Sequence, residues 1–183
     1  MSKNNQKKLN PVVWLTVTAM FMAMNIIMSM STFSIPVPGG HMYLNDLIIC
    51  TAAILLDPLG AFLVGGVGAF LGDLFFYPAP MFVSLVTHGL QAVVVSLCAH
   101  KLFKDKKAAG AIIGVILGII INVVGYSLGR AFIYGSPAPA IETALVKLPW
   151  QILQATCGSG LALVLCFPCR LTKLYDKIIK KGH

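Results

Sequence analysis

Long apolar stretches separated by short polar or Pro/Gly-rich breaks run through almost the whole chain. An apolar run of about twenty residues is long enough to cross the ~30 Å hydrocarbon core of a bilayer as an α-helix. The breaks divide the 183 residues into helices that we expect at 12–30, 44–56, 58–76, 81–100, 108–134 and 140–167. The hydrophobic pattern therefore predicts an all-α integral membrane protein, one domain with six transmembrane helices.

The second expected helix is unusually short. Residues 44–56 cover only about 20 Å at 1.5 Å per residue. Asp57 and Pro58 then begin the next helix, because Asp is a favourable N-cap and Pro suits the first helical position. The short span predicts either a loop that dips into the membrane or a cavity above the helix.

Charge gives the orientation of these helices. The chain is 57% hydrophobic and 11% charged, with a net charge of +8. Twelve of its 14 Lys and Arg residues fall within 3–8, 101–107 and 170–181, and six spans place all three clusters on one side. Positive residues mark the cytoplasmic side, so both termini, with basic tails 1–10 and 170–183, are expected there. The same rule explains the net charge without a nucleic-acid partner.

Polar residues recur at helical spacing on the last three expected helices, in the half farther from the basic clusters. The three stripes are Ser84, His88 and Gln91; Asn122, Tyr126 and Arg130; and Lys147, Gln151 and Gln154, with Trp150 adjacent. Facing lipid is costly, up to ~2.5–3.5 kcal/mol for a cation at mid-bilayer, so the stripes should face inward and line a polar cavity. His41, Tyr43 and Asn45 complete the candidate binding residues, and the aromatic rings could stack on a ring-shaped solute.

Two further interpretations of the stripes stay open. Arg130 and Lys147 could extend to the outer interface while the amides only bridge helices. The two cations could also pair with carboxylates instead of a ligand, namely Asp46, Asp73 or Glu142.

No motif indicates an enzyme or an energy source. The chain has no GxxxxGK[ST] phosphate-binding loop and no kinase or hydrolase signature. His88 with Asp46 or Asp73 would still need a nucleophile or a metal for acid–base catalysis, and no His/Cys/carboxylate cluster predicts a metal site. We therefore expect a binding subunit without cofactors, a facilitator or a structural subunit, and active uptake would need partner proteins.

Three features carry a resemblance to a known family: the six spans with basic cytoplasmic ends, the Ala19-x-x-x-Ala23 pair, and Gly65-Gly66-Val67-Gly68-Ala69-Phe70-Leu71-Gly72-Asp73-Leu74 before a Pro-containing loop. Over nearly its whole length the chain resembles an S component, the substrate-binding membrane subunit of an energy-coupling factor (ECF) vitamin transporter. It is most similar to the riboflavin, hydroxymethylpyrimidine and pyridoxine branch.

The resemblance implies a protein of the prokaryotic cell membrane that captures a small water-soluble vitamin outside the cell. It implies docking through Ala19 and Ala23 on a membrane coupling (T) subunit, with ATP hydrolysed by two separate cytoplasmic ATPases. Loops 31–43 and 75–80 would act as lids.

The identity of the vitamin stays open. His, Tyr and Trp residues favour a heteroaromatic ring, hence hydroxymethylpyrimidine or a pyridoxine-type vitamer. Arg130 and Lys147 would equally suit the carboxylate of pantothenate. A riboflavin S component also fits the resemblance, and a facilitator or structural subunit outside the ECF family fits the composition.

Overall fold

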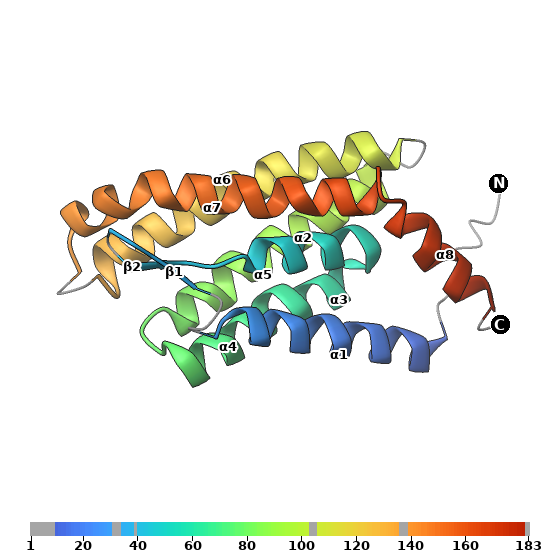
Figure 1. Cartoon of the computed structure of the whole chain (residues 1–183), viewed down its shortest axis with the longest axis horizontal. Helices are drawn as coiled ribbons and strands as arrows, with labels where there is room; N and C mark the ends of the chain where they lie inside the picture. The colour runs from blue at the N-terminus through green and yellow to red at the C-terminus, as the bar shows by residue number, and fades with distance from the viewer. Residues whose placement is uncertain (1–9, 31–33, 39, 103–105, 136–138, 182–183) are drawn as a thin grey trace.

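The computed structural model describes residues 10–30, 34–38, 40–102, 106–135 and 139–181, and they form an elongated helical bundle (Figure 1). Its helices are α1 (Pro11–Met28), α2 (Asn45–Leu55), α3 (Pro58–Phe62), α4 (Gly68–Phe76), α5 (Met81–Leu97), α6 (Lys107–Phe132), α7 (Ile141–Cys166) and α8 (Leu171–Lys181). A π-helical turn, Leu63–Val67, joins α3 to α4, and another, Cys98–Leu102, extends α5.

Five helical segments of the described residues are long and apolar enough to cross a membrane. They are Pro11–Met28, Pro58–Phe76, Met81–Leu102, Lys107–Phe132 and Ile141–Cys166. The predicted short second helix is α2, which has 11 residues and is apolar but shorter than a full span. The structure thus supports five membrane-crossing segments and a short inner helix, so the predicted count of six spans is not confirmed.

The short helix α2 lies inside the bundle. All of its residues except Leu47 are buried, and Ile49 and Ile54 are fully enclosed in the core. Long helices α5 and α7 pack against it, and their outer faces carry exposed apolar side chains suited to lipid. The bundle around α2 therefore extends beyond its N-terminus, where a cavity can form.

A two-stranded hairpin departs from the all-α prediction. The expected loop 31–43 contains β1 (Ile35–Val37) and β2 (Gly40–Met42), which pair antiparallel; residues 31–33 and 39 lie outside the described chain. Gly40 has φ +137°, a conformation that side chains rarely adopt. Figure 1 places the hairpin at the end of the bundle opposite α8.

The basic C-terminal segment, expected only as a tail, forms helix α8. Arg170 turns the chain between α7 and α8 with φ 60°. Tyr175 of α8 is buried against the apolar side chains of α2, whereas Leu174 and Ile178 are exposed. The first turn of α1 and helix α8 lie at the same end of the bundle (Figure 1).

Candidate solute-binding site

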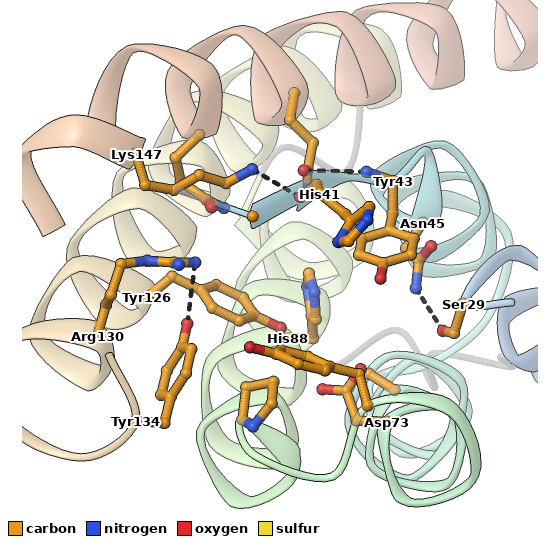
Figure 2. Close-up of a pocket in the computed structure, with 16 residues that line it drawn as sticks. Ser29, His41, Tyr43, Asn45, Asp73, His88, Tyr126, Arg130, Tyr134 and Lys147 are labelled. Carbon is orange, nitrogen blue, oxygen red and sulfur yellow. Dashed lines mark hydrogen bonds between the residues drawn. The ribbon is translucent and has the colours of Figure 1, made fainter. Parts of the chain in front are cut away.

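A cavity of about 70 Å³ lies beside the hairpin, between β2 and helices α2, α4, α5, α6 and α7 (Figure 2). Nine of the thirteen binding residues predicted from the sequence line it. These nine are His41, Tyr43, Asn45, His88, Tyr126, Arg130, Lys147, Gln151 and Gln154. The structure therefore brings most of the predicted set together, and their contact with a ligand stays a prediction.

Three predicted residues, Ser84, Gln91 and Asn122, do not line the cavity. Their side chains are fully buried among the helices beneath it. The stripes on α5, α6 and α7 do face inward, as the cost of polar groups in lipid predicts, but only part of each stripe reaches the cavity. The buried polar side chains beneath the cavity form hydrogen bonds with one another and with residues of the lining, and we call them the support of the cavity.

The support is centred on Asp46, in the first turn of α2. Its Oδ1 accepts hydrogen bonds from Gln91 Nε2 at 2.7 Å and Asn122 Nδ2 at 2.9 Å. Gln151 Nε2 donates to Asn122 Oδ1 at 2.6 Å, and His88 Nδ1 lies 2.8 Å from Gln91 Oε1. A buried hydrogen-bond network thus connects Asp46 to His88 and Gln151, which both line the cavity.

A second set of contacts surrounds Ser84. Its hydroxyl donates to Asp73 Oδ2 and lies 2.6 Å from the hydroxyl of Tyr126. The Tyr126 ring in turn meets His88 edge to face, with centroids 5.2 Å apart. Asp73, which lines the cavity, is thus held by a neutral partner.

The three candidate carboxylates have different surroundings among the described residues. Asp46 accepts from two amides and Asp73 from Ser84, whereas Glu142 is exposed in the first turn of α7. Among the described residues, the partners of Asp46 and Asp73 are therefore amides and a hydroxyl, and the contact of Arg130 and Lys147 with a ligand stays a prediction.

Two polar side chains of α7 form hydrogen bonds with the backbone of the hairpin and of the residue that follows it. Lys147 Nζ donates to the His41 carbonyl at 2.6 Å, and the Tyr43 amide donates to Gln154 Oε1 at 3.1 Å (Figure 2). Lys147 is only 2% exposed. The ammonium group of Lys147 thus binds a backbone oxygen inside the bundle, and the side chain does not extend to the membrane–water interface.

Arg130, on α6, lies at the aromatic side of the cavity. Its guanidinium is 5.3 Å from the centroid of the Tyr134 ring, and its Nη2 is 3.5 Å from the Tyr134 hydroxyl. Burial raises the pKa of Tyr134, and the nearby Arg130 charge opposes that rise. The phenol therefore stays neutral, and cation and ring together form one wall (Figure 2).

Tyr43 forms part of the opposite wall with His41. The two ring centroids are 6.4 Å apart. Burial raises the pKa of the Tyr43 phenol, and Asp73 and Tyr77 raise it further. Tyr43 thus presents a neutral hydroxyl that can donate a hydrogen bond.

Trp150 lies outside the cavity lining, so the expectation that it stacks on a ligand there has no support in the geometry. It is half-buried on α7. A residue next to Gln151 in sequence points about 100° away around an α-helix, which explains the difference.

Sequence reasoning left out several residues that line the cavity, among them Ser29, Asp73, Tyr77 and Tyr134. Asp73 and Tyr77 share the i, i+4 spacing that indicated the other stripes. Ser29, which ends α1, belongs to no such stripe; its hydroxyl accepts from Asn45 Nδ2 at 2.8 Å.

Comparison with known proteins identifies the family. A model of the family described as "ECF-type riboflavin transporter, S component" matches residues 10–172 of the chain. The chain belongs to this family. This S component is therefore the substrate-binding subunit of a vitamin transporter, a membrane protein rather than an enzyme.

Two curated relatives cover most of the S component. The thiamine precursor transporter HmpT of Lactococcus lactis subsp. cremoris (strain MG1363) is 30% identical over 169 residues, 90% of this chain and 89% of HmpT. A Pyrococcus woesei protein, described as an uncharacterized protein in a gap 3′ region, is 32% identical over 134 residues, 72% of this chain and 87% of that protein.

A solved structure shows the same fold. The S component of a bacterial ECF transporter superposes with a TM-score of 0.66 at 18% identity, covering 90% of this chain and 98% of the other. At that identity the likeness supports the fold alone.

Proposed function

We propose that this S component captures hydroxymethylpyrimidine, a thiamine precursor, outside a prokaryotic cell and delivers it through the plasma membrane. The observation that carries the proposal is the small cavity with polar and aromatic walls, together with the similarity to a transporter named for a thiamine precursor. A pyridoxine-type vitamer, also a single substituted heteroaromatic ring, is the nearest alternative.

The size of the cavity supports a single-ring solute. Its volume of about 70 Å³ is small beside the ~300–1,000 Å³ typical of pockets for drug-sized ligands. Riboflavin, with three fused rings and a sugar-like chain, would need the hairpin and the cavity walls to move apart. The small cavity therefore favours the pyrimidine even though the family is named for riboflavin.

The chemistry of the walls also favours a neutral heteroaromatic ring. His41 and Tyr43 on one side, and Tyr126 on another, offer ring faces and edges for stacking. Both cations of the cavity that could bind the pantothenate carboxylate already contact the protein: Lys147 gives one of its three ammonium hydrogens to the His41 carbonyl, and Arg130 lies against Tyr134. Pantothenate is therefore the less favoured ligand.

Transport requires partners that supply energy. We propose that the S component docks on a membrane coupling (T) subunit driven by two cytoplasmic ATPases. The exposed face of α1 supports this, because Ala19 and Ala23 lie on it and leave the backbone accessible to a partner helix. In this arrangement ATP hydrolysis is the task of the partner proteins.

Isothermal titration of the purified subunit with hydroxymethylpyrimidine, pyridoxine, pantothenate and riboflavin tests the proposal. We expect hydroxymethylpyrimidine to bind most tightly. Tighter binding of riboflavin or pantothenate would refute the substrate assignment, and no binding to any of the four would refute capture of these vitamins.

A further inference from the structure

The direction of the hydrogen bonds around Asp46 follows from the chemistry of its carboxyl group. Asp46 is fully buried, and its Oδ1 meets both Gln91 Nε2 and Asn122 Nδ2. An oxygen without a hydrogen can only accept, so both amides must present their NH₂ groups. Oδ2 has no partner among the described residues. The direction is therefore the same for the ionised group and for an acid with its hydrogen on Oδ2.

The first branch of this network runs to His88. Gln91 gives its NH₂ to Asp46, so its Oε1 faces the other way, where it accepts from Asn122 Nδ2 at 3.1 Å and meets His88 Nδ1 at 2.8 Å. The amide oxygen has no hydrogen to give, so His88 Nδ1 must carry one. In the neutral imidazole the other nitrogen, Nε2, is then a hydrogen-bond acceptor.

The second branch runs to Gln151. Asn122 also gives its NH₂ to Asp46, which turns its Oδ1 toward α7, where it accepts from Gln151 Nε2 at 2.6 Å. Gln151 lines the cavity, and its Oε1 is the amide atom left for a ligand. This oxygen can only accept, whatever the pH.

We infer that Asp46 is a specificity-determining residue that acts without touching the ligand. By fixing the direction of both branches, it makes the cavity present two acceptors, Gln151 Oε1 and His88 Nε2. The ligand must then donate hydrogen bonds to these two atoms, which an aminopyrimidine can do through its amino group and the same ring without that group cannot. This inference rests on the proposed function and specifies which part of the ring system the site selects.

Gln154 lies outside the Asp46 network, and its amide group has the opposite orientation to that of Gln151. Its Oε1 accepts from the Tyr43 amide, so its NH₂ is the part left for a ligand. Two glutamines on the same helix therefore present opposite groups to the cavity, because each has a different partner behind it. The site distinguishes the two edges of a polar ring.

The first test compares two ligands on the unmodified subunit. The hydroxymethyl aminopyrimidine should bind about 10- to 100-fold more tightly than the analogue with hydrogen in place of the amino group, because the analogue leaves buried acceptors unpaired. Equal affinities would overturn the inference and leave the proposed function standing. Failure of both pyrimidines to bind would refute the proposed function and, with it, the inference.

The second test measures the same affinity ratio in variants. Asp46→Ala should bring the ratio close to one, since both amides can then turn over, and Asp46→Asn should restore it, because an amide oxygen can still accept. A purely structural role would weaken both ligands equally and keep the ratio. A ratio unchanged in Asp46→Ala would overturn the inference.

Matched variants keep this test decisive. Ser96→Ala removes another fully buried hydrogen bond of α5, to the Leu56 carbonyl, away from the cavity and should leave the ratio unchanged. Should Asp46→Ala not fold, Asn122→Ala removes the acceptor of Gln151 Nε2 and should lower the ratio in the same way. Wild-type selectivity in a folded Asn122→Ala protein would also overturn the inference.

Discussion

Gly158 of α7 lies directly against Asp46 of α2, and we predict that Gly158→Ala destabilises the subunit. A Cβ at this position would lie 2.8 Å from Asp46 Cβ and 3.1 Å from the Leu47 backbone nitrogen. Real Cβ atoms almost never approach a neighbour so closely, and a backbone atom cannot turn away as a side chain can. The substitution therefore has to push α2 and α7 apart.

The magnitude follows from two opposing effects. Overpacking a close contact costs about 1–3 kcal/mol, and the backbone contact places this site in the upper half of that range. Replacing Gly by Ala within a helix also stabilises the helix by up to about 1 kcal/mol, because Ala has the higher helix propensity. The expected net loss is about 1–2 kcal/mol. Because Asp46 supports the floor of the cavity, ligand affinity should fall as well.

Gly160, on the same helix, is the matched control. A Cβ there would have no neighbour within 4 Å, so Gly160→Ala should keep or slightly raise stability and leave affinity unchanged. Thermal unfolding in one detergent, with titration of the ligand, measures both variants. If Gly158→Ala melted and bound like Gly160→Ala, the close packing of α2 on α7 would be wrong.

Two further substitutions test the hairpin anchor and the docking face. Lys147→Met removes the charged hydrogen bond to the hairpin and should weaken vitamin binding by up to about 10- to 100-fold, since such bonds contribute ~1.5–3 kcal/mol. Titration measures this change. Replacing Ala19 and Ala23 together by Leu should abolish vitamin uptake by cells, because bulky side chains block close helix approach, and should spare binding by the purified subunit.

Each of these predictions has its own control. Leu145→Met changes an exposed apolar residue of the same helix as Lys147 and should bind like the wild type; equal affinity of Lys147→Met would contradict the anchoring role. Val124→Leu adds bulk to an exposed position on α6 and should transport normally. Normal uptake by the double Leu variant would contradict the proposal that Ala19 and Ala23 form the docking face.

Much of the helical framework is predictable because two strong local effects determine it. The cost of polar groups in lipid requires long apolar segments and turns the stripes inward. Capping determines where helices start: Asp57 Oδ1 accepts from the Gly60 amide at 3.4 Å, as the Asp-Pro pair predicts. These effects act within one helix, so one sequence is enough to find them.

The remaining features depend on contacts between elements distant in sequence. The strands of the hairpin have three residues each, too few for an alternating pattern to stand out. Asp46 has no polar neighbour at helical spacing on α2, and its importance comes from Gln91 and Asn122 on other helices. The position of Trp150, away from the cavity, likewise depends on how α7 is rotated in the bundle.

The most direct test of the account is to identify the small molecule that the subunit retains when it is purified from cells supplied with a mixture of vitamins. Mass spectrometry of the released ligand should give the mass of hydroxymethylpyrimidine, in an amount that falls in Lys147→Met protein. Release of riboflavin or pantothenate in its place would contradict the central claim.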